Sequence, residues 1–321
     1  MERRTTMPKL NALAITLLGV PALIAQPAPQ AGAKTIGQQL AAARPLIKAA
    51  NDALDFEKAQ EIALGLLPTT KPTFDASSVR AADMSTKAYA DYCMAYFMAY
   101  QACDNMGQWE KGREYLKTAC DLAKESVDTG KAKLTEARDD YKKLANQFQS
   151  LLDRNADAVA ALKAKAKLED YEETSMKMVK DWEAQKAEND KWAAFFQYDL
   201  DWAQRQYDDF KKFLDAQDAR IKGQNDEIAK FILQADKKIK DMDAEVAKFT
   251  VTQSHKGKWA EGVITTPAYM NSFAEKADKV GFIHRLIVLD PENPALKQAL
   301  RDVKEGKSGV QPKAAAKAKK K

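Results

Sequence analysis

Three cysteines are the residues of this chain best suited to redox or metal chemistry. They are Cys93, Cys103 and Cys120, and their spacing fits none of the patterns that hold zinc. Cys93 and Cys120 lie almost equally far on either side of Gly107, so an antiparallel helical hairpin that turns there brings them to the same level. In an oxidising compartment this arrangement predicts a Cys93–Cys120 disulfide. Buried free thiols that pack as small apolar groups are the alternative.

The two histidines and the acidic pairs do not assemble a recognisable catalytic site. His255 stands in a polar connection, and His284 lies in a helical segment without a second metal ligand at suitable spacing. Asp139-Asp140 and Asp208-Asp209 are neighbours along predicted helices, so the carboxyl groups of each pair do not face one another. The chain has no phosphate-binding glycine loop, nucleophile elbow or HExxH motif. We therefore predict a protein that is not an enzyme and that uses no cofactor or metal.

Aromatic residues are densest between 192 and 213, where they offer a candidate surface for binding another protein. The residues that fall beside the face a paired helix would bury are Trp192, Phe195, Tyr198 and Trp202. Because Trp and Tyr anchor many interfaces, these four are candidate partner-binding residues, together with Tyr100 earlier in the chain. The alternative is a third helix that covers them and makes them the core of a local bundle, which is the commoner role of an aromatic stripe.

The elements that must position these residues are helices. Ala, Lys, Asp, Glu, Gln and Leu dominate the 321-residue chain, which has only 13 Gly and 11 Pro. The long unbranched residues lose little rotamer freedom in a helix, and no stretch alternates at period two for long enough to suggest a sheet. We predict an all-α fold.

Residues 126–250 predict a long antiparallel coiled-coil hairpin. Apolar and amide residues three and four positions apart form two series, one including Leu134, Ala137, Tyr141, Leu144, Phe148 and Leu151, the other including Ala203, Tyr207, Phe210, Leu214, Gln217, Ile221, Gln224 and Ile228. The pattern fades between Lys163 and Lys177, so we expect the chain to turn within 165–190 and return. Residues 251–306 would then pack beside residues 34–125. A straight helix over 126–250, about 190 Å long at 1.5 Å per residue, is the alternative.

Shorter helices with turn signals make up residues 34–125 and 251–306. They contain helical hairpins, one turning at Gly107 and another at Asp290-Pro291. These segments resemble degenerate tetratricopeptide repeats, and the residues that carry the resemblance are Gly107, Gly112, Leu116, Ala119, Leu286, Leu289, Asp290 and Pro291. The resemblance covers about a third of the chain, and Cys103 stands where the repeat usually has tyrosine. It implies a concave surface for a peptide or protein and no enzymatic activity. Plain helical hairpins of no family are the alternative.

The amino terminus has the layout of a secretory leader. A basic segment at 3–9 precedes an uncharged, largely apolar run at 10–25, and Ala31-Gly32-Ala33 offers a cleavage site for a signal peptidase. We predict a signal peptide over 1–33 and export to the periplasm, or out of the cell, in a bacterium.

Positive charge is concentrated at the two ends of the chain. Of the formal net charge of +5, residues 1–33 contribute +2 and the six lysines of 307–321 contribute +6, so residues 34–306 carry −3. This body is not a nucleic-acid-binding surface by charge. The tail at 307–321 is predicted to be disordered, and it either contacts anionic lipid or cell-wall polymer or only increases solubility.

A leader, repeat-like hairpins and heptads without catalytic residues together predict a non-catalytic exported scaffold or adaptor that binds a protein partner through its helices. One alternative is a self-associating coiled coil that acts as a structural spacer of the cell envelope. Another is membrane or cell-wall contact through the lysine-rich tail.

Overall fold

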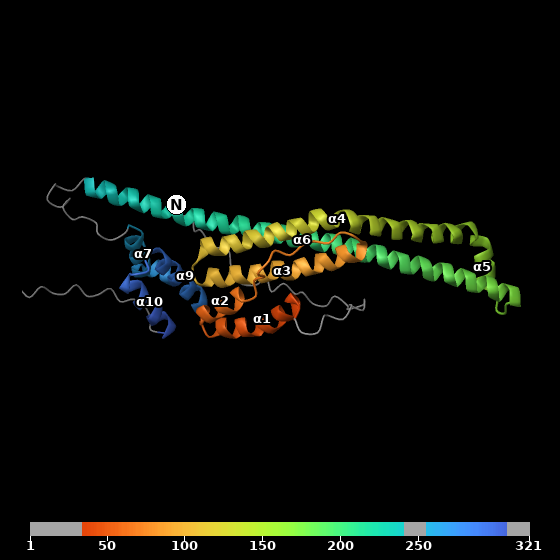
Figure 1. The fold of residues 1–321 in the computed structure, drawn as a ribbon, viewed down its shortest axis with the longest axis horizontal. Helices are drawn as coiled ribbons and strands as arrows, with labels where there is room; N and C mark the ends of the chain where they lie inside the picture. Colours follow the sequence, from red (N-terminus) through yellow and green to blue (C-terminus); the bar gives the residue numbers. More distant parts are fainter. Residues whose placement is uncertain (1–33, 241–254, 307–321) are drawn as a thin grey trace, which may run out of the picture. The chain divides into compact units, whose positions relative to one another are not determined.

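The computed structural model describes residues 34–240 and 255–306, which are mostly helical (Figure 1). In chain order the helices are α1 (Ile36–Asp52), α2 (Phe56–Leu64), α3 (Val79–Asn105), α4 (Trp109–Arg154), α5 (Ala156–Ala164), α6 (Asp170–Lys240), α7 (His255–Thr265), α8 (Pro267–Met270), α9 (Lys276–Leu289) and α10 (Pro294–Lys304). These ranges contain no strand, so the predicted all-α fold is confirmed.

All the helices named above belong to one compact unit that begins at Ile36. The predicted signal peptide at 1–33 and the lysine-rich tail at 307–321 lie outside the described residues.

The predicted long hairpin is formed by α4 and α6, which pack closely against each other (Figure 1). Their direction is antiparallel, as shown by the pairs Arg113–Asp218 and Arg138–Gln197. Apolar residues at helical spacing fill the seam, among them Leu134, Ala137, Ala145, Val179, Ala193, Phe196, Ala203 and Phe210. Leu134, Ala137, Ala203 and Phe210 belong to the predicted series and are buried, but Leu144 of the first series is 41% exposed and Ala145 is buried instead.

The turn of the hairpin lies at 155–169, so it begins before the predicted range of 165–190 and needs neither Gly nor Pro. Lys165 adopts an extended conformation and ends α5. The Glu172 carboxylate then accepts a hydrogen bond from the backbone N–H of Glu169 at 3.2 Å and pairs with the Lys165 side chain. A glutamate that reaches back to the residue before the helix is half of a capping box, and this contact fixes the start of α6.

A third helix, α3, packs on the hairpin through the turn at Gly107. Gly107 has a φ of +67°, and a Cβ placed there would lie 2.2 Å from the backbone nitrogen of Arg285, so this position needs glycine. Residues of all three helices share one core, which includes Tyr89, Phe97, Tyr100, Leu116, Ala119 and Phe210. α4 runs without a break through 125 and 126, so the predicted repeat-like region and the predicted coiled coil share one helix.

The remaining helices lie against this three-helix bundle. α1 and α2 pack on α3 through a small core of Leu40, Ala43, Leu66, Ala95 and Met98. α7, α9 and α10 form a second core with the carboxyl-terminal part of α6, and its members include Ile228, Trp259, Ile283, Leu286 and Leu296. α9 also contacts α3, so residues 251–306 pack beside residues 34–125, as expected for a hairpin that returns.

Arg285 links the core of the three-helix bundle to the core that α7, α9 and α10 form with α6. Its side chain is 1% exposed and lies over the Trp109 ring, with the guanidinium carbon 4.4 Å from the ring centroid. The guanidinium donates to both carboxylate oxygens of Glu110 at 2.7 Å, to the Gly107 carbonyl at 3.1 Å and to the Gln224 side chain at 2.8 Å. One residue of α9 is thereby bound to the α3–α4 turn, to α4 and to α6.

Candidate functional site

Of the five aromatic residues predicted to bind a partner, one is buried, three are half-buried and one is exposed. Trp192 and Phe195 are half-buried and pack against a core cluster formed by Ala82, Leu134, Ala137 and Phe196. Tyr141 of α4 completes this aromatic group, with ring centroids 6.1 Å from Trp192 and 5.9 Å from Phe196. The third helix of the alternative interpretation is α3, whose first residue, Val79, packs against the same cluster.

The other three aromatic candidates have different environments. Tyr100 of α3 is 5% exposed and shares the core of the three-helix bundle with residues of α4 and α6, so its proposed role as a contact residue is corrected. Trp202 is half-buried. Tyr198 is 52% exposed, with Arg205 at 5.9 Å from the ring centroid. The structure therefore leaves Tyr198 as the most accessible of the five, and the set does not form one continuous surface.

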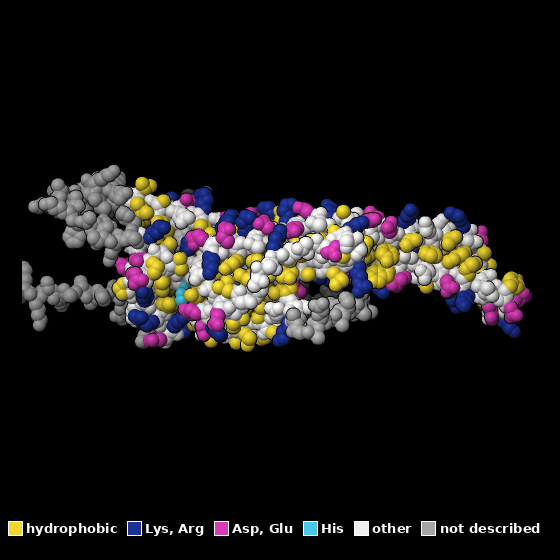
Figure 2. Space-filling view, in the orientation of Figure 1, with side chains coloured by type: hydrophobic (Ala, Val, Ile, Leu, Met, Phe, Trp, Pro, Cys, Tyr) yellow, Lys and Arg dark blue, Asp and Glu magenta, His cyan; other side chains and the backbone are white. Residues whose placement is uncertain are grey.

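Beyond Tyr141 and Trp192 the hairpin continues without α3, and this part, residues 142–191, is called the distal arm here (Figure 1). Only two helices pair along it, so apolar side chains that a third helix would cover meet solvent. Leu144, Met178 and Tyr171 are 41%, 48% and 66% exposed. Figure 2 shows hydrophobic side chains gathered along this arm.

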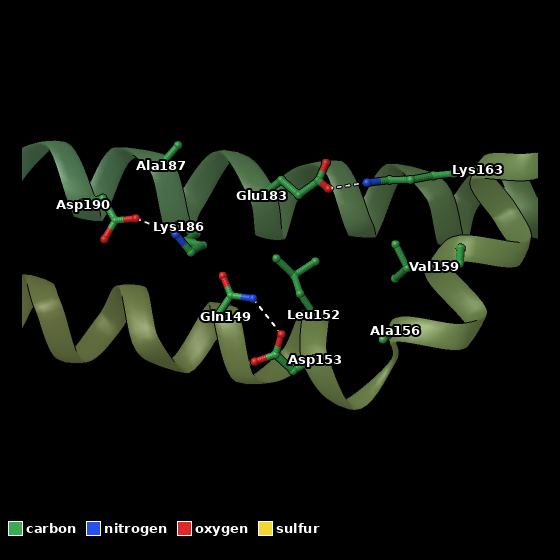
Figure 3. Close-up of a pocket in the computed structure, with 11 residues that line it drawn as sticks. Gln149, Leu152, Asp153, Ala156, Val159, Lys163, Glu183, Lys186, Ala187 and Asp190 are labelled. Atoms are coloured by element: carbon green, nitrogen blue, oxygen red, sulfur yellow. Dashed lines mark hydrogen bonds and ion pairs between the residues drawn. The ribbon is translucent and has the colours of Figure 1, made fainter.

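An open groove of about 610 Å³ lies on the distal arm between the end of α4, α5 and α6 (Figure 3). Its apolar part consists of Leu152, Ala156, Val159, Ala160 and Ala187. Four of these five come from α4 and α5, and Leu152 points from α4 toward α6 in Figure 3. Small residues on the floor leave the space that makes the groove.

Three polar pairs border the groove, one between α5 and α6 and two within a single helix. Lys163 of α5 reaches across to Glu183 of α6 at 2.7 Å. Lys186 pairs with Asp190 at 2.6 Å, and Gln149 donates to Asp153 at 2.7 Å (Figure 3). The Lys163–Glu183 pair is exposed, and exposed ion pairs contribute roughly 0–1 kcal/mol to stability. Either side chain can therefore leave the other and pair with a charge on a bound molecule.

α5 is the most weakly held wall of the groove. None of its nine residues is buried, whereas each of α3 and α4 contributes many residues to the core. The helix is held by its two ends, by the half-buried Val159 and Leu162 and by the Lys163–Glu183 pair, so it belongs to the less tightly packed parts of the fold.

The cysteines and histidines do not converge on a catalytic arrangement within the described residues. Cys93, Cys103 and Cys120 are buried free thiols, and burial raises the pKa of each. Cys93 donates to the Ala119 carbonyl, next to Cys120 in the chain, so the two thiols lie near the same level and their pairing stays a prediction. In the described ranges no three His, Cys, Asp or Glu side chains gather as metal ligands do.

His284 is a core residue at the junction of α2 and α9. Its ring centroid lies 6.0 Å from that of Phe56, and burial lowers the pKa of the imidazole, against the opposing effect of Glu57. The side chain of His255 lies outside the described part of the structure.

The groove residues were not singled out by the sequence. The one sequence signal for the groove residues is the fading of the heptad pattern between Lys163 and Lys177. Where the pattern weakens but apolar residues continue, some of these apolar residues are left uncovered by the partner helix. Alanines and mixed charges give no other local sign of a groove.

Comparisons with known proteins assign no family to the chain. No helix in the described ranges is both long and apolar enough to span a membrane. No family model matches the chain, and neither a curated protein nor a solved structure matches it.

Proposed function

We propose that this protein is a non-catalytic scaffold of the bacterial cell envelope that binds a partner protein by accepting an amphipathic helix in the distal-arm groove. The observation that carries the proposal is the groove itself, which presents apolar side chains of α4, α5 and α6 at the part of the hairpin that α3 does not cover. The leader at 1–33 supplies the expectation of export.

The structure of the groove favours a helix over other peptide conformations. An added strand needs a sheet edge with free backbone groups, and the walls here are helices whose backbone groups bond internally. A proline-rich peptide docks between aromatic side chains, and no aromatic residue lines this groove. A floor of Ala156, Ala160 and Ala187 instead admits the projecting side chains of a helix.

The charges at the border suit an amphipathic helix with both signs on its polar side. Lys163 and Lys186 stand near Glu183 and Asp190, so acidic and basic residues of the incoming helix each find a partner. Surface pairs of this kind select register and orientation more than they add affinity.

Photocrosslinking tests the proposal with a matched pair of sites on one helix. A photoreactive amino acid replaces Ala187, which lines the groove, or Ala184, an exposed alanine of α6 that does not line it. The full-length protein is expressed in its host, and crosslinked species are identified by mass spectrometry. We expect one recurring protein at Ala187 and little or none at Ala184.

A second pair of variants tests whether the groove binds the partner. Ala187→Glu adds a charge to the floor, whereas Ala184→Glu adds the same charge outside it. We expect Ala187→Glu alone to abolish the crosslinked complex formed from a reactive group at Ala160. Equal crosslinking in both variants, or equal products at both reactive sites, would remove the groove from the function.

The alternative function is a self-associating spacer, and the exposed Leu144, Met178 and Tyr171 on the same arm favour it. In that case the crosslinks join two copies of this chain, and sedimentation equilibrium of the mature protein gives a dimer or larger assembly. A monomer would rule it out. The tail at 307–321, the basis of the lipid or cell-wall alternative, lies outside the described residues, and its deletion with unchanged sedimentation of membranes and wall would exclude that contact.

A further inference from the structure

The side of the hairpin that binds α3 continues onto the distal arm, where no third helix of the described chain covers it. On α6, residues seven positions apart face α3: the Phe213 ring centroid lies 5.2 Å from that of Phe97, and Arg220 pairs with Asp104 at 2.7 Å. Residues at a spacing of seven stay on one side of a helix in a coiled coil. Followed back into the distal arm, the same heptad position holds Tyr171, Met178 and Gln185.

α4 has a matching heptad position. Gly130 lies against α3, since a Cβ placed on it would be 3.3 Å from the hydroxyl oxygen of Thr86. Ala137, seven residues further on, packs in one cluster with Ala82 of α3. The next two residues at this spacing are Leu144 and Leu151, and both lie on the distal arm. The surface that α3 occupies between α4 and α6 therefore extends past the first residue of α3.

The residues at these two positions on the distal arm are called the open face here: Leu144, Leu151, Tyr171, Met178 and Gln185. None of them is charged, and all but the half-buried Leu151 are exposed. The open face and the groove lie on different sides of the arm. Met178 and Ala187, which lines the groove, are nine residues apart, and nine residues make two and a half turns of an α-helix. Their side chains therefore leave α6 on opposite sides.

The charges of the distal arm favour a second copy of this chain, lying antiparallel, as the occupant of the open face. Residues 142–191 hold ten Lys or Arg and ten Asp or Glu, so two arms do not repel each other. The tip, 155–175, holds three basic and five acidic residues and carries −2. The base, 142–154 and 176–191, holds seven basic and five acidic residues and carries +2. In an antiparallel pair the tip of each arm lies on the base of the other, so opposite net charges meet.

We propose that two copies of the protein pair through their open faces, with the arms antiparallel, so that each arm covers the surface that α3 leaves bare on the other. A two-fold pairing is self-complementary, so one set of apolar residues serves both copies. Because the arm extends beyond α3 (Figure 1), the tip of each arm ends where α3 of the other copy begins. The inference goes beyond the proposed function and does not rest on it, because the groove stays accessible on another side of each arm.

The open face is large enough for a weak dimer. The part of α6 in the arm, 170–191, is about 30 Å long at 1.5 Å per residue, and two packed helices are about 20 Å wide. The pairing thus covers about 600 Å² on each copy, or about 1,200 Å² in total, which is at the lower end of the range for specific interfaces. We expect a dissociation constant on the order of 10 µM.

Sedimentation equilibrium of the exported protein at concentrations from about 1 to about 200 µM tests the pairing, because self-association follows mass action. Met178→Glu places a carboxylate in the interface twice, once from each copy, and should weaken the dimer by at least about tenfold. Ala184→Glu adds the same charge six residues further along α6, a third of a turn away from the open face, and should leave the dissociation constant unchanged. Both replaced side chains are exposed, and circular dichroism checks that both variants keep their helix content.

A gain of affinity and a direct contact complete the test. Gln185→Leu replaces the one polar residue of the open face and should tighten the dimer by at least about threefold, an effect that misfolding does not produce. A photoreactive amino acid at Met178, in the native host, should crosslink to a second copy. A monomer at every concentration, a dimer that Met178→Glu leaves intact or that Ala184→Glu weakens equally, or crosslinks only to a different protein would each overturn the proposal.

Discussion

Removal of the Arg285 side chain should detach the carboxyl-terminal helices from the three-helix bundle before the bundle itself unfolds. Arg285 is 1% exposed and donates to Glu110, Gly107 and Gln224 while it lies on Trp109. These are the contacts by which α9 is held to α4, α6 and the α3–α4 turn. The substitution Arg285→Ala removes all of them and leaves a cavity.

The magnitude follows from what each partner loses. Breaking a buried ion pair costs about 3–5 kcal/mol only when the partner's charge stays buried. The Glu110 side chain is 58% exposed and is solvated after the substitution, so loss of this pair contributes about 0–1 kcal/mol, as for a surface pair. The Gly107 carbonyl and the buried Gln224 amide lose a donor, at about 1–3 kcal/mol for each unsatisfied group that water does not reach. Loss of the contact with Trp109 adds about 0.5–2 kcal/mol. We expect a total near 3 kcal/mol once water partly enters.

Hydrogen exchange measures the local loss of protection in the carboxyl-terminal helices, and urea unfolding measures the loss in the free energy of unfolding of the whole protein. Peptides from α7, α9 and α10 should lose protection in Arg285→Ala, while those covering the middle of α4 keep it. Arg301→Ala is the matched control, because Arg301 lies on α10 and bonds only the neighbouring Gln298 in the described structure. Arg285→Lys should restore part of the stability through Glu110. A loss below about 1 kcal/mol, or one no larger than that of Arg301→Ala, would refute the role assigned to Arg285.

Three further outcomes are expected. Gly107→Ala should destabilise the protein by more than about 2 kcal/mol, measured by urea unfolding, since alanine is strained at positive φ and its Cβ would meet the Arg285 backbone. His284 has a lowered pKa in the folded state, so its contribution to stability is present above about pH 6.5 and is lost as the pH falls toward the folded value; His284→Leu should flatten this part of the profile of unfolding free energy against pH. If Cys93 and Cys120 form a disulfide in the exported protein, unfolding without reductant exposes one titratable thiol and unfolding with reductant exposes three; three thiols in both conditions would exclude the bridge.

The helical hairpin could be predicted because its determinants repeat along the chain. Leu134 and Phe210 occupy positions in series of apolar residues three and four apart, and both are buried in the structure. The same series does not show where a neighbouring module begins. α4 keeps its apolar face from Leu116 to Ala145, so no change of pattern marks the passage from the three-helix bundle to the distal arm.

The functional features depend on residues that are distant in sequence and ordinary in type. Tyr100 resembles an exposed anchor until α4 and α6 are placed around it. Asp83 and Asp199 each stand on a charged helix where the sequence suggests a solvated residue, and the packing of the helices nevertheless buries both. The distal arm begins where α3 ends, and the sequence signal for that end is the cap at Ser78, whose hydroxyl accepts from the Ala81 backbone N–H.

The long helix α6 also determines the order in which the molecule can assemble. Its contacts with the earlier helices join residues far apart in the chain: Arg113 and Asp218 are separated by 105 positions, and Asp104 and Arg220 by 116. The link from Gly107 to Arg285 spans 178. Helical proteins usually fold rapidly because their contacts are local. Here the apolar faces of α3 and α4 are covered only when a segment more than a hundred residues away packs on them. The hairpin of α3 and α4 would form early, and the rate of folding would be set by the arrival of α6, which has to close a large loop before either core is complete.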